Sequence, residues 1–187
     1  SKAFKSKNIK KLSIIQNKSV ELSLLLSIPA SLGLIFASEE IVNALFGYGS
    51  FSVDDVKLTS NAVKFFGFGI PAFALVKILS NFFFARNNTK TPFYISTAIV
   101  VINTTICVSL FTYFGFIIIP ISTSISTWIG VLIYIYLLHQ KKFLLLNIQL
   151  LPNLIKILVS TMIMSIILVL LLNNYENYLN YLYKFKA

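Results

Sequence analysis

The sequence predicts an all-α protein that is a polytopic bundle of transmembrane helices. The first observation is apolar length, because about 20 apolar residues in a helix cross the hydrocarbon core of a bilayer. Five stretches reach that length, and they are residues 22–46, 62–85, 93–114, 116–138 and 151–172. The second observation is composition: 57% of the chain is hydrophobic and its mean hydropathy is +0.82, too apolar for a soluble domain.

The distribution of positive charge predicts the orientation of these spans. Of the 16 Lys and Arg residues, ten fall in three segments, which are residues 1–20, 86–91 and 139–150. Only three fall in the alternate segments, which are residues 47–60, 113–116 and 173–187. Because positive charge is retained on the cytoplasmic side, the first set is expected to be cytoplasmic and the second set to face outward.

The basic leader, residues 1–20, is expected to be a cytoplasmic loop between two spans rather than a signal peptide. The chain is therefore expected to be part of a larger transporter. We divide it into this loop, a lobe of four spans over residues 21–140, and residues 141–187. The last part holds a cytoplasmic linker, the fifth span and an outer segment.

The net charge of +10 does not indicate a nucleic-acid partner, since the charges flank membrane spans and meet anionic lipid headgroups. Catalysis is not indicated either. The only histidine, His139, ends a span, and the only cysteine, Cys107, lies inside one, so neither a catalytic triad nor a thiolate metal site is visible. We therefore expect a transporter without a bound metal.

Local signals mark where several helices begin. Ser52 precedes two acidic residues and is expected to cap a helix that starts near Val53. Thr91 before Pro92 is expected to cap the third span, because proline suits the first helical turn. Pro152 has the same place at the start of the fifth span.

Other signals mark where helices end. The first span should stop crossing lipid near Ser38, because Glu39 and Glu40 are costly at depth. The glycine-rich segment 47–50 is expected to end the helix itself. The turn at residues 113–115 is so tight that the third and fourth spans must be antiparallel neighbours.

Two prolines, Pro29 and Pro71, lie inside spans and are predicted to kink their helices, because each removes a backbone hydrogen bond. In lipid, the freed backbone groups must be satisfied by neighbouring helices or by a wet cavity. Ordinary packing is one interpretation, since proline is common in membrane helices. Two successive kinked helices favour a second interpretation, which is a transporter whose helices bend.

Lys77 is the most informative ionisable residue, because it lies well inside the second span, with Asn81 one turn further on the same face. Inserting a central lysine costs about 2.5–3.5 kcal/mol. One hypothesis makes Lys77 and Asn81 part of a substrate cavity that attracts an anionic group. The alternative is a lysine that snorkels to the cytoplasmic interface.

Polar residues also gather in the third and fourth spans. Small and hydroxylated side chains let helices approach closely, and close packing is the main interpretation. The other hypothesis is a cation or polar-substrate site in which Asn103 and Thr123 face each other across the hairpin.

Three ordered motifs resemble the MurJ/MviN family of lipid II flippases. The first is SIPASLGLIFASEEIVNALFGYGSF at residues 27–51. The second is FGIPAF at residues 68–73, followed by VKIL at 76–79, and the third is FFFARNNTKTP at 82–92. Each motif alone is weak, but together they cover about residues 1–140 in the order and spacing of that family.

The resemblance implies a fourteen-span, two-lobed flippase of the bacterial cytoplasmic membrane that moves a lipid-linked peptidoglycan precursor by alternating access for cell wall biogenesis. This chain is similar to spans nine to thirteen, so the N-terminal lobe is the expected partner. The resemblance also implies no bound cofactor but a coupling cation, sodium or proton, or the membrane potential. Asn103 and Thr123 would match a cation site, although Cys107 replaces the acid or amide often found nearby. The fifth span would line a groove for the prenyl tail.

Two alternatives stay open at this point. One is another polysaccharide-lipid flippase or a drug exporter of the same superfamily, which an N-terminal lobe rich in intramembrane arginines would argue against. The other is an inactive, truncated membrane protein, because five spans with half a cavity should not transport alone.

The predicted orientation has a direct test in cysteine labelling. A cysteine placed at position 54 should react with an impermeant reagent from outside, and one at position 87 only from the cytoplasmic side. The opposite pattern of labelling would reject the topology.

Overall fold

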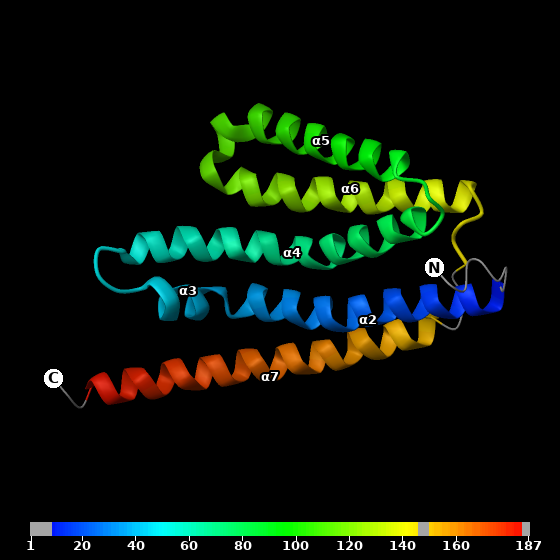
Figure 1. Cartoon of the computed structure of the whole chain (residues 1–187). Helices are drawn as coiled ribbons and strands as arrows, with labels where there is room; N and C mark the ends of the chain where they lie inside the picture. The colour runs from blue at the N-terminus through cyan, green and yellow to red at the C-terminus, as the bar shows by residue number, and fades with distance from the viewer. Residues whose placement is uncertain (1–8, 146–149, 185–187) are drawn as a thin grey trace.

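A computed structural model describes residues 9–145 and 150–184 of the chain (Figure 1), and these residues form helices and short turns without any strand. The all-α prediction is confirmed. The elements are, in order, α2 (Ile9–Phe36), α3 (Ser38–Phe46), α4 (Val53–Phe84), α5 (Lys90–Phe114), the 3-10 turn η1 (Gly115–Ile117), α6 (Ile118–Gln140) and α7 (Leu150–Lys184).

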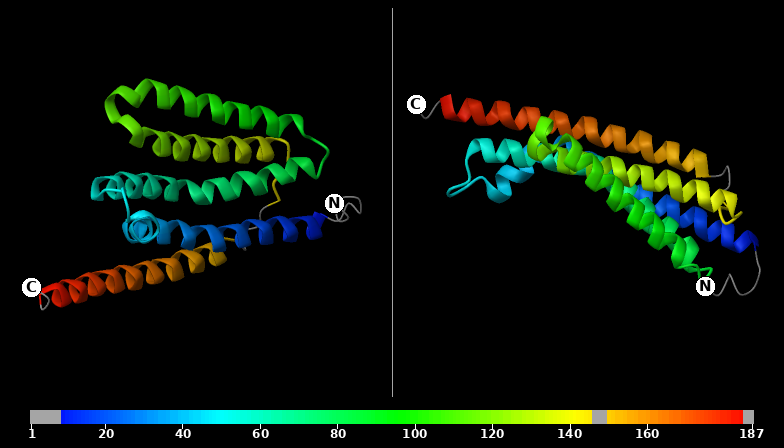
Figure 2. Two further views of the ribbon diagram at one scale, coloured as in Figure 1. Left: turned by 60° about the vertical axis from the view of Figure 1, so that its left-hand side comes forward. Right: turned by 90° about the horizontal axis from the view of Figure 1, so that it is seen from above.

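The long helices lie side by side in one row, in the spatial order α5, α6, α4, α2, α7 (Figure 1, Figure 2). The centre of the row is the packing of α4 against α2 on one side and α6 on the other. The buried apolar cluster lies mainly there, and its members include Ala72, Leu79, Phe83, Val131, Tyr134 and Leu138. Both broad faces of the row expose large apolar side chains, as expected for a surface that meets lipid or further helices.

Four helical stretches of the described residues are long and apolar enough to cross a membrane. The third, Lys90–Gln140, has 51 residues, about twice the length that one crossing needs. It contains α5 and α6, which fold back on each other through η1 (Figure 1). Each of the five predicted spans is therefore mainly helical, and the chain is a multi-pass membrane protein.

The leader differs from the expected loop. Residues 9–20 are helical and form the first turns of α2, while residues 1–8 lie outside the described residues. The physical reason is tertiary contact on one side of these turns. Gln16, 2% exposed, and Val20, 6% exposed, are buried although the intervening Lys18 is not.

The first span also differs, because its predicted range of 22–46 is divided. α2 ends at Phe36, Ala37 has the non-helical angles φ −106° and ψ 21°, and α3 follows from Ser38. The interruption lies two turns after Pro29, which itself sits inside a continuous part of α2. The division coincides with the point where the sequence places Glu39 and Glu40, so α3 carries both carboxylates in its own first turn.

Two of the three predicted helix starts are confirmed. Ser52 caps α4: its Oγ accepts from the Asp55 N–H, and the Asp55 carboxylate accepts from the Ser52 N–H. Pro152 lies in the first turn of α7. The prediction for Thr91 is wrong, because α5 begins at Lys90 and the Asn88 side-chain oxygen accepts from the Thr91 N–H at 3.1 Å.

The hairpin between α5 and α6 closes as the sequence predicts. Gly115 ends α5 with φ 60°, a left-handed conformation that favours glycine. Further along α6, a Cβ at Gly130 would overlap the side chain of Ile99 on α5. The absence of a side chain at Gly130 is thus what allows the two helices to approach closely.

Pro71 is buried inside α4, where its missing N–H leaves the carbonyl of Gly67 without its usual helical donor. Ser31 of α2 supplies the replacement, because its Oγ donates to the Gly67 oxygen at 2.7 Å. Two more carbonyls of this stretch receive donors from α6: the Ser124 Oγ donates to Phe65 and the Trp128 Nε1 donates to Phe68. Neighbouring helices therefore satisfy the proline site, as the sequence requires in lipid.

The bond from Ser31 can be tested with a double-mutant cycle. Ser31→Ala should reduce the free energy of unfolding in mixed micelles by about 1 kcal/mol, since it removes an interhelical hydrogen bond. Pro71→Ala restores a helical donor to the Gly67 carbonyl, so in that background Ser31→Ala should have a smaller effect. Ser109→Ala, on an exposed position of α5, is the matched control. An equal loss in both backgrounds would contradict this account.

Candidate functional site

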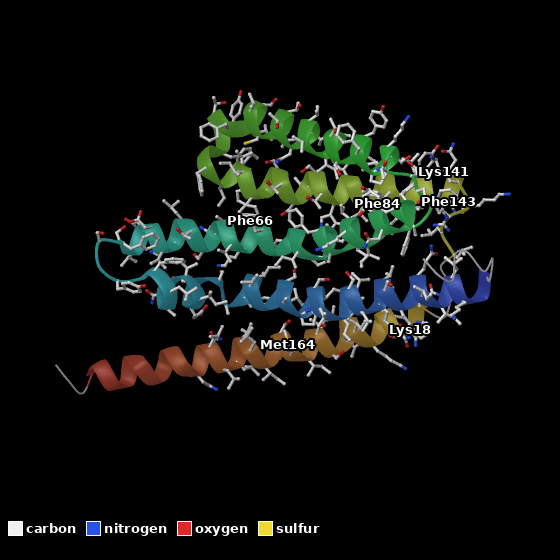
Figure 3. The ribbon with its side chains drawn as sticks, in the orientation of Figure 1. Lys18, Phe66, Phe84, Lys141, Phe143 and Met164 are labelled. Carbon is white, nitrogen blue, oxygen red and sulfur yellow. The ribbon has the colours of Figure 1, made fainter. Side chains whose placement is uncertain are left out.

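Lys77 and Asn81 lie on one exposed face of α4, between the flanks that α2 and α6 cover. Phe66, Phe73 and Phe84 belong to the same face, because they lie eleven, four and seven residues from Lys77 and are also exposed. Phe66 and Phe84 are labelled in Figure 3. The structure thus brings the predicted cavity pair together on an aromatic face.

The side chains of Lys77 and Asn81 make no hydrogen bond or ion pair with any other described residue. A lysine in this position has all three ammonium donors available for an anionic group. Its exposure on a broad face is compatible with both sequence hypotheses, the cavity and the snorkelling lysine. The predicted role of the pair therefore stays a prediction.

The second predicted pair, Asn103 and Thr123, is arranged differently. The Asn103 Oδ1 accepts from the Ser122 Oγ at 2.7 Å, across the α5–α6 hairpin. Thr123 instead donates to the Ile119 carbonyl of its own helix at 2.7 Å. Among the described residues, Asn103 therefore pairs with the neighbour of Thr123. The half-buried thiol of Cys107 lies one turn further along α5.

Close packing accounts for most hydroxyl groups of α6. Ser122, Ser124 and Thr127 are buried, and a Cβ at Gly69 of α4 would come within 2.7 Å of the Ser124 Oγ. Thr127 donates to the carbonyl of Thr123. The main sequence interpretation of these residues, an interface of small side chains, agrees with this geometry.

Three buried polar atoms of α2 and α3 have no hydrogen-bond partner within the described part of the chain. They are the Oγ atoms of Ser27 and Ser38 and one carboxylate oxygen of Glu40. Buried polar groups normally have partners. Further helices or water are the physical means of satisfying these three.

A cluster not predicted from the sequence lies at the end of the row that holds the α4–α5 turn. We call it the clasp, and it consists of Ser13, Gln16, Arg86 and the segment 143–145. The Gln16 side chain donates to the Phe143 carbonyl at 3.0 Å and accepts from the Leu145 N–H at 2.9 Å. Ser13 donates to the Leu145 carbonyl. These bonds attach the segment that follows α6 to the first turns of α2.

Arg86 completes the clasp from the end of α4. One guanidinium nitrogen donates to the Phe82 carbonyl at 2.7 Å and the other to the Phe143 carbonyl at 3.1 Å. The guanidinium carbon also lies 4.2 Å from the centroid of the Phe143 ring, which is labelled in Figure 3. Burial lowers the pKa of Arg86, yet arginine stays charged in proteins.

One feature of the sequence could have indicated the clasp. Arg86 is the only arginine among 16 cationic residues. A planar fork of donors that also stacks on an aromatic ring is a property of arginine that lysine lacks. A single arginine in a lysine-rich chain therefore indicates a position where that geometry is used.

An open pocket of about 350 Å³ lies beside the clasp at the start of α5, lined by Thr89, Lys90, Phe93 and Tyr94. Both aromatic side chains are well exposed. Aromatic and cationic side chains gather at the headgroup level of membranes. The pocket thus agrees with a membrane interface at this end of the row.

The sequence model of one family, described as lipid II flippase MurJ, matches residues 1–186. The chain belongs to the MurJ family. It is 38% identical over 182 residues, 96% of the chain, to the probable lipid II flippase MurJ of Rickettsia prowazekii. To the protein of the same name in Buchnera aphidicola subsp. Baizongia pistaciae it is 33% identical over 90% of the chain.

The fold agrees with a solved structure of the MurJ family. A chain described as lipid II flippase MurJ in an inward closed conformation superposes with a TM-score of 0.75 at 29% identity, covering 88% of this chain. This chain covers 34% of that structure, and 35% and 33% of the two relatives named above. It thus spans about a third of the length of the MurJ proteins that it matches.

The contacts of Arg86 in the clasp have a direct test. We expect Arg86→Lys to weaken the attachment of residues 143–145. A lysine cannot reproduce both hydrogen bonds and the stacking, and bonds to charged groups contribute about 1.5–3 kcal/mol. The Leu145 amide should therefore exchange with deuterium roughly tenfold faster or more. Lys90→Arg, at the same end of the row, should leave its exchange rate unchanged. Unaltered protection of Leu145 in Arg86→Lys would rule out the clasp.

Proposed function

We propose that this chain forms the C-terminal-lobe part of a flippase that moves lipid II across the cytoplasmic membrane by alternating access. The family match over residues 1–186 carries the proposal. The similarity of fold to a MurJ chain in an inward closed conformation supports it. The whole activity needs the remaining two thirds of the protein, which would include the N-terminal lobe.

In this proposal, the face of α4 that bears Lys77 and Asn81 looks into the substrate cavity. The lysine ammonium attracts the pyrophosphate of the substrate, and the Asn81 amide adds a polar contact. Exposure on a face that α2 and α6 leave uncovered supports this role. The prenyl tail stays in lipid along the apolar surface of α7.

Alternating access requires helices that change shape, and α2 and α4 each contain a proline, Pro29 and Pro71. Donors on separate helices hold the backbone around Pro71, so a shift of α2 against α4 would exchange those bonds. We propose that bending at both prolines accompanies the change between inward-facing and outward-facing states.

The driving force in this proposal is a coupling cation, sodium or proton, or the membrane potential. Asn103 and Thr123 are the proposed polar contacts for a cation. The hydrogen bond between Asn103 and Ser122 places side-chain oxygens of α5 and α6 next to each other, which supports such a contact.

The proposed location is the bacterial inner membrane, with residues 1–20, 86–91 and 139–150 in the cytoplasm. Anionic lipids would meet the cationic residues of these segments. The aromatic pocket beside Lys90 supports an interface at this depth.

A chimera tests the proposed function. Residues 1–187 would replace the matching segment of the Rickettsia prowazekii MurJ protein, and the chimera would be tested for rescue of cells depleted of their own lipid II flippase. We expect rescue, and we expect Lys77→Ala to lower lipid II translocation at least several-fold, because the cavity would lose a cation.

Lys156→Ala is the matched control, since Lys156 is an exposed lysine within the α7 span. It should leave translocation unchanged. A chimera that inserts and folds but does not rescue would argue against the proposed function. Rescue with undiminished translocation in Lys77→Ala would instead assign Lys77 to snorkelling.

A further inference from the structure

A second polar pocket lies at the cytoplasmic end of the row, between α2 and the start of α7. Its volume is about 160 Å³. The lining residues are Ile14, Asn17, Lys18, Glu21, Leu150 and Asn153. Lys18 is labelled in Figure 3 beside the first turns of α7. We call this cavity the α2–α7 pocket, and it lies outside the α4 face and the clasp.

The α2–α7 pocket contains one positive and one negative side chain that do not neutralise each other. Lys18 is exposed and Glu21 is half-buried. They lie three residues apart, on neighbouring positions of one helix face. Neither forms an ion pair or a side-chain hydrogen bond within the part of the chain that the structure describes. A half-buried carboxylate without a partner is energetically unfavourable at a membrane surface.

A ligand that satisfies both groups must carry an anionic and a cationic part a short distance apart. The cationic part should also donate hydrogen bonds, because the Glu21 carboxylate only accepts them. A phosphate joined by a two-carbon link to a primary ammonium has this chemistry. Asn153 of α7 adds an amide that both donates and accepts at the opposite wall.

The depth of the α2–α7 pocket indicates a membrane phospholipid as the source of that headgroup. The next turns of α2 toward the membrane centre expose Leu22, Leu25 and Leu26, of which Leu26 is 73% exposed. On the facing helix, Leu151 and Ile155 are exposed as well. Acyl chains of a lipid held by its headgroup would lie against these residues.

We propose that the α2–α7 pocket binds the zwitterionic headgroup of phosphatidylethanolamine from the cytoplasmic leaflet. The phosphate pairs with Lys18, the primary ammonium donates to the Glu21 carboxylate, and Asn153 contacts the phosphate. The lipid joins the first turns of α2 to those of α7, where the α2–α7 contact begins. The site is independent of the proposed transport activity, which uses a different face of the row.

The test is native mass spectrometry of the purified 187-residue chain with three phospholipids of identical acyl chains. Phosphatidylethanolamine should bind about tenfold more tightly than phosphatidylcholine, whose quaternary ammonium cannot donate to Glu21; tenfold corresponds to about 1.4 kcal/mol. It should also bind more tightly than phosphatidylglycerol, which lacks an amine.

The variants separate the two charges. Glu21→Gln should abolish the preference for phosphatidylethanolamine over phosphatidylcholine, while Lys18→Gln should weaken the binding of all three lipids. Glu39→Gln and Lys90→Gln make the same charge changes outside the pocket and should alter neither result. Asn153→Leu, which fills the pocket without changing charge, should lower phosphatidylethanolamine binding even where a charge variant disturbs folding.

Three results would overturn the proposal. Tighter binding of phosphatidylglycerol than of phosphatidylethanolamine would show attraction to a cationic surface only. An unchanged lipid preference in Glu21→Gln would remove the carboxylate from the site. Competition by soluble glycerophosphoethanolamine as strong as that by the lipid would assign the pocket to a free headgroup. None of these outcomes depends on whether the chimera transports lipid II.

Discussion

The carbonyl of Gly67 depends on another helix for its hydrogen bond, and the arrangement of the row follows from that dependence. Pro71 cannot donate, and water is absent from the hydrocarbon core, so the donor must be a side chain from a neighbour. Ser31 of α2 supplies it, while Ser124 and Trp128 of α6 bind the carbonyls on either side of Gly67. α4 is therefore placed between α2 and α6, with no large side chain at Gly67 or Gly69 to separate them.

A row of helices leaves two broad faces, and their chemistry is unequal. Most exposed residues are apolar and suit lipid tails or further helices. The α4 face differs, because Lys77 and Asn81 interrupt its aromatic residues. The chain spans about a third of the length of its relatives, and the polar cavity proposed above would make a lone lysine at this depth favourable.

The end of the row that holds the α4–α5 turn is organised by polar contacts rather than by apolar packing alone. The clasp attaches residues 143–145 to α2 and to the end of α4, through Gln16 and Arg86. Residues 143–145 are thereby held against α2, and α7 packs along the same helix. The clasp and the α2–α7 pocket use different chemistry. The clasp is built on hydrogen bonds to backbone groups, whereas the pocket contains Lys18 and Glu21, which have no ion-pair partner among the described residues.

The sequence by itself determined the all-α class, the five spans, the Ser52 cap, the tight turn at Gly115 and the family, because apolar length, local capping and ordered motifs are written in neighbouring residues. It also placed Lys77 and Asn81 on one face, since helical periodicity is local. Only the tertiary structure decided that residues 9–20 are helical, that Ala37 divides the first span, and that Asn103 bonds to Ser122. Each depends on contacts between residues far apart in the chain or on the exact rotation of one helix against another. Gln16 and Ser31 show the limit most clearly: they are ordinary polar residues in sequence, and their partners, Phe143 and Gly67, are brought to them only by folding.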